Sequence, residues 1–125
     1  MTTSPHVLDV GQCNPDHGAI RSLLETMGVT VSRAHTLADA KQQLERTRFD
    51  LVLVNRIFDA DGTEGMRLID HIAALPAESR PPVMLVSNYA DAQASAVERG
   101  ALSGFGKNAL RSPDTRARLE QVLKR

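Results

Sequence analysis

The chain has 125 residues, with 15 basic and 15 acidic side chains and therefore no formal net charge at pH 7. This length suits one domain, residues 1–125, whose core is large enough to need neither disulfides nor a structural metal. The charge balance argues against nucleic acid as the main partner, because that affinity comes from basic residues that neutralise phosphates.

The sequence carries no sign of a membrane or an export route. No apolar run approaches the roughly 20 residues of a membrane-spanning helix. The N-terminus MTTSPHV lacks the basic and long apolar regions of a signal peptide. The only cysteine, Cys13, cannot form an internal disulfide and fits a reducing compartment. We therefore expect a cytoplasmic protein with no membrane contact, and no output domain after residue 125.

The first predicted strand, HVLDVG at 6–11, leads into a helix. Asn14 is the expected N-cap, Pro15 occupies the first helical position, and Gly28 follows the end. An apolar stripe at helical spacing predicts the buried side of this helix. The stripe consists of Ile20, Leu23, Leu24 and Met27.

The middle of the chain repeats this alternation twice. A strand at 29–34 precedes a helix that opens with Thr36, with Asp39 three residues later as in a capping box. A strand at 50–55, DLVLVN, is followed by an acidic loop and by a helix predicted from about residue 64 to 74. The buried side of that helix is expected to carry Met66, Ile69, Ile72 and Ala73.

The last third of the chain adds two more units. A strand at 82–87 precedes a weakly amphipathic helix at about 90–99, and a strand at 101–106 precedes a helix capped by Ser112. The first, third and fourth strands are nearly continuous in Val and Leu, which is typical of strands covered by helices on both faces. The sequence therefore predicts an α/β fold with a five-stranded parallel, doubly wound sheet and five helices.

In this architecture ligands bind at the carboxyl ends of the strands. At those positions the sequence resembles the receiver domain of bacterial two-component response regulators, which has a flavodoxin-like, CheY-like fold. The resemblance covers essentially the whole chain. It is carried by five segments: VGQCNP, LVLVN, LVS, Gly100-Ala101 and Lys107.

Receivers of this family hold magnesium with two acidic residues after the first strand and an acceptor Asp after the third. A hydroxyl and a lysine then hold the phosphoryl oxygens. The resemblance assigns the acidic pair to Gly11 and Gln12, or to Gln12 and Cys13 after a shift of one residue. It assigns the phosphoacceptor position to Asn55, and the hydroxyl and ammonium to Ser87 and Lys107.

These substitutions remove the chemistry that the resemblance implies. A carboxylate is the nucleophile that forms an aspartyl phosphate, and a carboxamide cannot replace it. Magnesium prefers anionic oxygen ligands, so we expect no tight magnesium site and no cofactor. Asp59 and Asp61 supply the nearest carboxylates, and phosphorylation at Asp59 is the unconventional alternative. The chain is thus expected to be a pseudo-receiver.

The readout of phosphorylation is also altered. Family members usually carry an aromatic residue three positions before the lysine, which moves inward when the hydroxyl moves. Gly104 stands there, with Phe105 on the other face, and Asn88 replaces the small residue after the hydroxyl. Lys107, without an acceptor carboxylate, is expected to pair with Asp59 or Asp61, or to point into solvent.

Two further side chains are candidates for the pocket or its floor. Asp9 lies inside a central strand, where burying a charged carboxylate is costly. We expect it to pair with a residue on a neighbouring strand, to lie at a solvated edge, or to reach toward the space beside Gly11. Cys13 lies near a helix start, where a thiolate is favoured, so it is either a redox sensor or an inert thiol. The histidines lack metal-ligand spacing and are expected at the surface: His6, His17, His35 and His71.

The leading functional hypothesis is a non-enzymatic signalling module that binds another protein. The resemblance places the partner surface on the fourth helix, fifth strand and fifth helix, and the partner is a signalling protein or a second copy of the chain. The charged residues expected there are Glu98, Arg99, Arg111, Arg116, Arg118 and Glu120. The alternatives are a small-ligand or redox sensor at the strand ends, or an unconventionally phosphorylated receiver.

Overall fold

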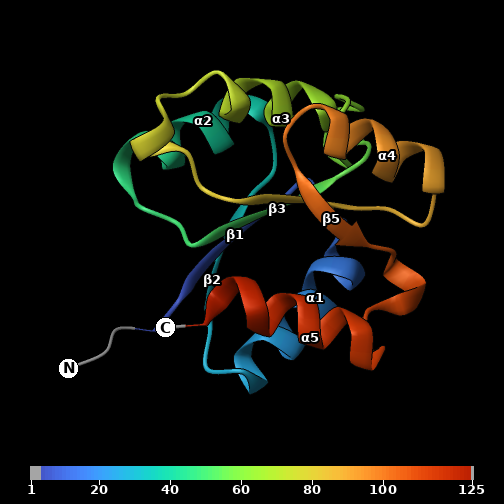
Figure 1. Cartoon of the computed structure of the whole chain (residues 1–125). Coiled ribbons are helices and arrows are strands. Elements are labelled where there is room, and N and C mark those ends of the chain that lie inside the picture. The colour runs from blue at the N-terminus through green and yellow to red at the C-terminus, as the bar shows by residue number, and fades with distance from the viewer. Residues whose placement is uncertain (1–3, 125) are drawn as a thin grey trace.

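Strands and helices alternate along the chain in the computed structural model, which describes residues 4–124 (Figure 1). The strands are β1 (His6–Val10), β2 (Thr30–Ala34), β3 (Leu51–Asn55), β4 (Val83–Val86) and β5 (Leu102–Phe105). The helices are α1 (Asn14–Thr26), α2 (Leu37–Arg46), α3 (Met66–Ala73), α4 (Ala90–Glu98) and α5 (Pro113–Leu123). Short 3₁₀ turns cover Ala77–Ser79 and Lys107–Ala109.

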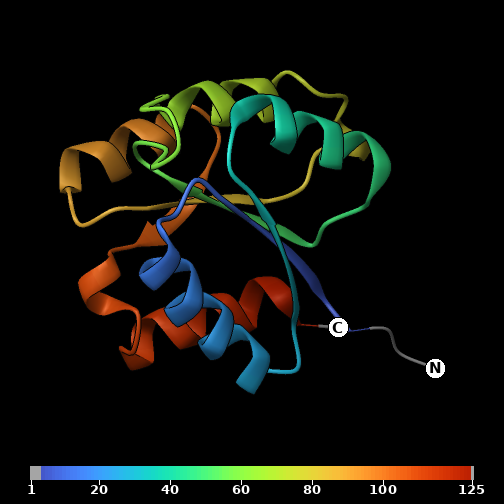
Figure 2. The same cartoon turned by 180° about the vertical axis from the view of Figure 1, so that it is seen from behind.

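The sheet has the strand order β2-β1-β3-β4-β5, and every pair of neighbouring strands is parallel. Helices α1 and α5 cover one face, and α2, α3 and α4 cover the other (Figures 1 and 2). This arrangement confirms the predicted five-stranded, doubly wound sheet. It brings the residues that follow β1, β3, β4 and β5 to one edge of the sheet.

The core is aliphatic and lies in two layers, one on each face of the sheet. All five residues of β3 and all four of β4 are buried, as is β1 after its first residue. This burial on both faces confirms the interpretation of the three Val- and Leu-rich runs. Burial of such side chains is the main stabilising contribution to the fold.

Local capping signals were accurate at two of the helices. The Asp39 backbone N–H donates to the Thr36 hydroxyl over 3.1 Å, and the Asp114 N–H donates to the Ser112 hydroxyl over 3.2 Å. The prediction for α1 was wrong by one residue, because the helix already includes Asn14 and its N-cap is Cys13. The cap position is occupied without a side-chain hydrogen bond.

The loop before α3 departs most from prediction. The helix begins at Met66, two residues later than expected, and its buried residues include Leu68, which the sequence reading omitted. The intervening chain forms a tight loop, in which the Phe58 N–H donates to the Thr63 carbonyl over 2.8 Å. The loop turns the Phe58 ring inward, where it is 1% exposed. In the described part of the chain, no helix combines the length and apolar character needed to span a membrane.

Candidate functional site

The carboxyl edge of the sheet contains a hollow of about 530 Å³. Its lining residues are Cys13, Asn55, Arg56, Ile57, Asp59, Val86, Ser87, Asn88, Tyr89 and Lys107. We call this set the strand-end pocket. Six residues singled out in the sequence therefore do meet here, namely Cys13, Asn55, Asp59, Ser87, Asn88 and Lys107. Gly11, Gln12 and Gly104 do not line the pocket.

Asn55, in the phosphoacceptor position, is the floor of the strand-end pocket and is 8% exposed. Its side-chain Nδ2 donates to the Gly11 carbonyl over 2.9 Å and to the Ile57 carbonyl over 2.6 Å. Both partners accept hydrogen bonds, so the nitrogen of the amide must face them. Asn55 thus joins the end of β3 to the end of β1, which a carboxylate cannot do because it has no proton to donate.

Gly11, one of the acidic-pair positions, lies against the ring of Phe58. A Cβ atom added at Gly11 would approach the Phe58 ring to 2.3 Å, and the backbone there has a φ of +81°. Any side chain at this position would meet both a steric and a conformational obstacle. The Gly11 carbonyl also accepts from the Asp59 N–H over 2.9 Å. Phe58 therefore occupies the space beside the end of β1, a placement that no sequence pattern indicates.

Gln12, the other acidic-pair position, is buried near Asp9 rather than in the pocket. Asp9 is fully buried, and its Oδ2 lies 2.6 Å from His17 Nδ1 on α1. The expectation that His17 is a surface residue was wrong, since it is only 9% exposed. The partner of Asp9 is on a helix, neither on a neighbouring strand nor in the space beside Gly11. Burial raises the pKa of Asp9, and the hydrogen bond with His17 opposes that shift.

Four buried polar atoms near this pair have no hydrogen-bond partner among residues 4–124: Asp9 Oδ1, Gln12 Nε2, Gln12 Oε1 and Arg33 Nε. Arg33 lies beside Asp9 in the pairing of β1 with β2, and its Nη2 donates to the Gln12 carbonyl over 3.0 Å. The second acidic-pair position thus belongs to a polar cluster beneath α1, separate from the strand-end pocket.

Lys107 pairs with a carboxylate that sequence reasoning did not consider. Its Nζ lies 2.8 Å from Asp16 Oδ2 on α1, and both side chains are about one-third exposed. The predicted pairing with Asp59 or Asp61, or a solvent-facing ammonium, was wrong. The hydrogen bond from Lys107 lowers the pKa of Asp16. The ammonium at the pocket rim therefore holds α1 to the segment that follows β5.

Ser87 and Tyr89 form the wall contributed by the end of β4. The Ser87 hydroxyl is buried and accepts from the Tyr89 N–H over 3.2 Å. The Arg56 guanidinium lies over the Tyr89 ring at 4.8 Å from its centre, within cation–π range. Tyr89 is 62% exposed, so this pair forms the rim of the strand-end pocket. Both residues follow predicted strand ends, but the sequence assigns neither of them a role and gives no sign of their contact.

Gly104, the position expected to carry the moving aromatic residue, lies tightly against β4. A Cβ atom added there would come within 2.1 Å of the Leu85 carbonyl oxygen, so no aromatic side chain fits. Phe105 packs on the opposite face, in the core layer under α1 and α5, as expected. The Gly104 N–H donates to Gln93 Oε1 over 3.1 Å. Gln93, on α4, was missed because only its partners reveal its role.

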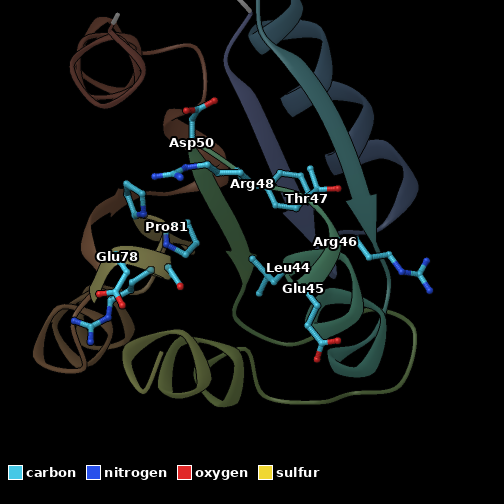
Figure 3. Close-up of a pocket in the computed structure, with 12 residues that line it drawn as sticks. Leu44, Glu45, Arg46, Thr47, Arg48, Asp50, Glu78 and Pro81 are labelled. Atoms are coloured by element: carbon cyan, nitrogen blue, oxygen red, sulfur yellow. The ribbon is translucent and has the colours of Figure 1, made fainter. Parts of the chain in front are cut away.

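A second hollow, of about 480 Å³, lies at the opposite edge of the sheet. Figure 3 shows Arg48 and Asp50 on the segment before β3, and Glu78 and Pro81 on the segment before β4. Ligands of doubly wound sheets bind at the carboxyl ends of the strands, which is the other edge. The strand-end pocket is therefore the candidate functional site. Among residues 4–124, no group of three or more His, Cys, Asp or Glu side chains is arranged to hold a metal.

Solved structures of response regulators share this architecture. A putative response regulator from Chloroflexus aurantiacus is 18% identical with a TM-score of 0.79, and the match covers 98% of this chain and 100% of that one. A response regulator from Thermotoga maritima is 25% identical with a TM-score of 0.78, over 98% and 100%. The signal receiver domain of a DNA-binding response regulator from Colwellia psychrerythraea is 20% identical with a TM-score of 0.81, again over 98% and 100%.

The chain has the receiver fold. No model of a protein family and no curated protein matches it. Within the receiver fold, the strand-end pocket lies where the resemblance places phosphoryl transfer. Its side chains nevertheless form a different set of contacts, centred on Asn55, Phe58 and the Lys107–Asp16 pair.

Proposed function

We propose that the chain is a receiver-like module of two-component signal transduction that acts by binding another protein and is not phosphorylated. The observation that carries this proposal is the pair of hydrogen bonds donated by Asn55 to Gly11 and Ile57. A phosphoacceptor must present a free carboxylate oxygen to the donor. Asn55 has no such oxygen, and its amide nitrogen is engaged by the backbone.

The other parts of a phosphoryl site are likewise engaged elsewhere. The space beside Gly11 is filled by the Phe58 ring, and Gln12 is buried away from the pocket. Lys107 is paired with Asp16. Asp59 is the one carboxylate among the residues that line the pocket. Magnesium prefers several anionic oxygens, so this lining argues against a tight metal site. These contacts support a non-catalytic, cofactor-free role.

The proposed partner surface comprises α4, β5 and α5, which lie together at one edge of the sheet, with the two helices on opposite faces (Figures 1 and 2). Three large apolar side chains are exposed in the described chain, and all belong to this side: Tyr89, Val97 and Leu102. Arg99 pairs with Asp70 over 2.7 Å, and Arg116 lies 3.6 Å from Glu120. Apolar side chains within a mixed-charge rim suit protein recognition, by a signalling protein or by a second copy.

The proposal is tested by offering the protein a phosphoryl donor. We expect no mass increase after incubation with acetyl phosphate and magnesium, and no amide NMR shift at Gly11, Asn55, Ser87 or Lys107 on adding beryllofluoride. The Asp59→Ala variant is the matched control. Phosphate incorporation that disappears in Asp59→Ala would contradict the proposal and would establish the unconventional receiver instead.

The same NMR assay addresses the sensor alternative. Saturable shifts around Cys13, Ser87 and Lys107 with a small anion, in the absence of phosphate incorporation, would make the strand-end pocket a ligand site. Partner capture then gives the positive test. A protein that binds wild type but does not bind a correctly folded Tyr89→Ala variant would support the proposed surface.

A further inference from the structure

Gln93 makes the densest set of side-chain hydrogen bonds near the proposed partner surface. Its Nε2 donates to the carbonyls of Leu85 over 2.8 Å, Ser87 over 3.1 Å and Phe105 over 3.3 Å. Its Oε1 accepts from the Gly104 N–H over 3.1 Å. One side chain from α4 thereby contacts the backbones of both β4 and β5. We call these four contacts the Gln93 bridge.

The Gln93 bridge lies where the pairing of β4 with β5 is irregular. The pairing of β4 with β5 shifts register between Met84 and Val86, so the ladder of hydrogen bonds is interrupted there. Such an irregularity leaves backbone groups without strand partners. Gly104 allows the close approach, because a Cβ atom there would lie 2.1 Å from the Leu85 carbonyl oxygen. The Phe105 carbonyl still accepts from the Ser87 N–H over 3.0 Å, and Gln93 adds hydrogen bonds to this interrupted stretch, including the one from the Gly104 N–H.

Two further side chains hold the same region. Asn88 Oδ1 accepts from the Asn108 N–H over 3.0 Å, and a Cβ atom at Gly106 would come within 2.3 Å of that oxygen. From the other side, Arg118 on α5 donates through Nη1 to the Gly104 carbonyl. Polar side chains thus connect α4, β5 and α5 to one another through the backbone of β5.

We infer that the Gln93 bridge fixes α4 on β4 and β5 in a single arrangement, so that the partner surface keeps one shape whether or not the strand-end pocket is occupied. Displacing α4 would remove the partners of backbone groups that lie between a helix and the sheet, which is costly. Gly104 also removes the aromatic side chain that the resemblance implies as the moving part. Partner binding is then constitutive, without a switch. This inference rests on the proposed function only in taking α4, β5 and α5 as the partner surface.

The test compares wild type with Gln93→Met, which keeps the length of the side chain but has no hydrogen-bonding amide. In wild type, NMR relaxation dispersion should detect no microsecond-to-millisecond exchange in α4 or β5, with or without beryllofluoride. In Gln93→Met, the Gly104 amide should exchange with solvent about tenfold faster, because its acceptor is lost. Exchange broadening should appear in α4 at the same time.

A second variant, Gln93→Glu, turns a carboxylate toward three carbonyls. Its matched control is Gln42→Glu, which makes the same change on the exposed side of α2. We expect exchange broadening of the α4 amide signals in Gln93→Glu and no such broadening in Gln42→Glu. Two-state exchange in wild type, or unchanged Gly104 protection in Gln93→Met, would overturn the inference. The wild-type measurement needs no variant, so two-state exchange of α4 would overturn the inference even if both Gln93 variants fail to fold.

The two proposals fail in different experiments. Incorporation of phosphate would contradict the proposed function while leaving a rigid α4 unaffected. Exchange of α4 in the free wild-type protein would contradict the role of the Gln93 bridge while leaving the absence of phosphorylation unaffected.

Discussion

The side-chain amide of Asn55 donates a 2.9 Å hydrogen bond to the backbone carbonyl of Gly11, and so connects the ends of β3 and β1. The asparagine is a structural member of the strand-end pocket and not simply an acceptor aspartate that has lost its charge. The same nitrogen also holds the Ile57 carbonyl, over 2.6 Å, at the start of the loop that carries Phe58. Restoring a carboxylate at position 55 would therefore remove a contact as well as add a nucleophile.

We predict that Asn55→Asp destabilises the protein and does not restore phosphorylation. The carboxylate would face two carbonyl oxygens, losing two hydrogen bonds and adding repulsion, for a cost of about 2–4 kcal/mol in the free energy of unfolding. Urea unfolding measures this cost, and mass spectrometry after acetyl phosphate treatment measures phosphorylation. Asn108→Asp, at an exposed position, should change stability by no more than about 0.5 kcal/mol. Equal stability of both variants would show that the Asn55 contacts contribute little.

Two glycine-to-alanine substitutions should have opposite effects. Gly104→Ala places a methyl group 2.1 Å from the Leu85 carbonyl oxygen and should cost about 1–3 kcal/mol. Gly18→Ala, inside α1 with no neighbouring atom within 4 Å of the new Cβ, should stabilise by about 0.5–1 kcal/mol. Thermal unfolding of the pair gives the comparison. A stable Gly104→Ala protein would mean that β5 adjusts more easily than its packing implies.

The buried Asp9 predicts a characteristic pH dependence. Burial raises its pKa in the folded state above the usual 3.8, so the folded protein binds this proton more tightly than the unfolded chain does. Its contribution to stability is therefore most favourable below pH 3.8 and is lost as the pH rises through the higher folded-state pKa. Relative to wild type, Asp9→Asn should gain stability over that pH range, measured by urea unfolding at successive pH values.

The hydrogen bond of Asp9 with His17 allows a further comparison. Asp9→Ala adds a second comparison, because it leaves the buried His17 without its partner and should cost about 1–3 kcal/mol at neutral pH. A pH-independent difference for Asp9→Asn would contradict the predicted shift.

The Lys107–Asp16 pair predicts a change at the carboxylate when the lysine is removed. The hydrogen bond from Lys107 lowers the pKa of Asp16 below the usual 3.8, so its contribution is present above pH 3.8 and is lost as the pH falls through the lower value. In Lys107→Met, the pKa of Asp16 should rise toward 3.8, as followed by NMR of the carboxyl carbon. Because the pair is partly exposed, the loss of stability should stay below about 1 kcal/mol.

The exposed Lys124 provides the control for that measurement. In Lys124→Met the pKa of Asp16 should be unchanged. If Lys107→Met also leaves it unchanged, the 2.8 Å contact does not persist in solution, and Lys107 is free to bind an anion in the strand-end pocket.

The fold was predictable from the sequence because its signals are local and repeated. Continuous apolar runs marked the buried strands, and Thr36 and Ser112 marked two helix starts through their own backbone neighbours. The position of Asn55 at a strand end followed from the same pattern. Predicting the receiver fold thus required only the order of the strands and helices and the handedness of their connections.

The contacts within the site were less predictable because they join residues distant in the chain. Asp9 needed a partner, but only the packing of α1 on β1 identifies it as His17. Lys107 had two acidic residues in the expected loop, yet Asp16 lies nearer across the sheet edge. In the sequence Gln93 is an ordinary helix residue. Its role follows only from the interrupted pairing of β4 and β5 and from its contact with Gly104. Sequence patterns specify elements, whereas tertiary geometry selects partners.

The strand β5 ends the sheet, and an exposed sheet edge is normally open to pairing with a strand of another chain. Here that edge is short, at four residues, and its outward-facing Gly104 carbonyl is already taken by the Arg118 side chain. The edge is thereby protected against strand-to-strand aggregation. We therefore expect a protein that recognises this side of the molecule to contact the side chains of α4 and α5 and not to extend the sheet.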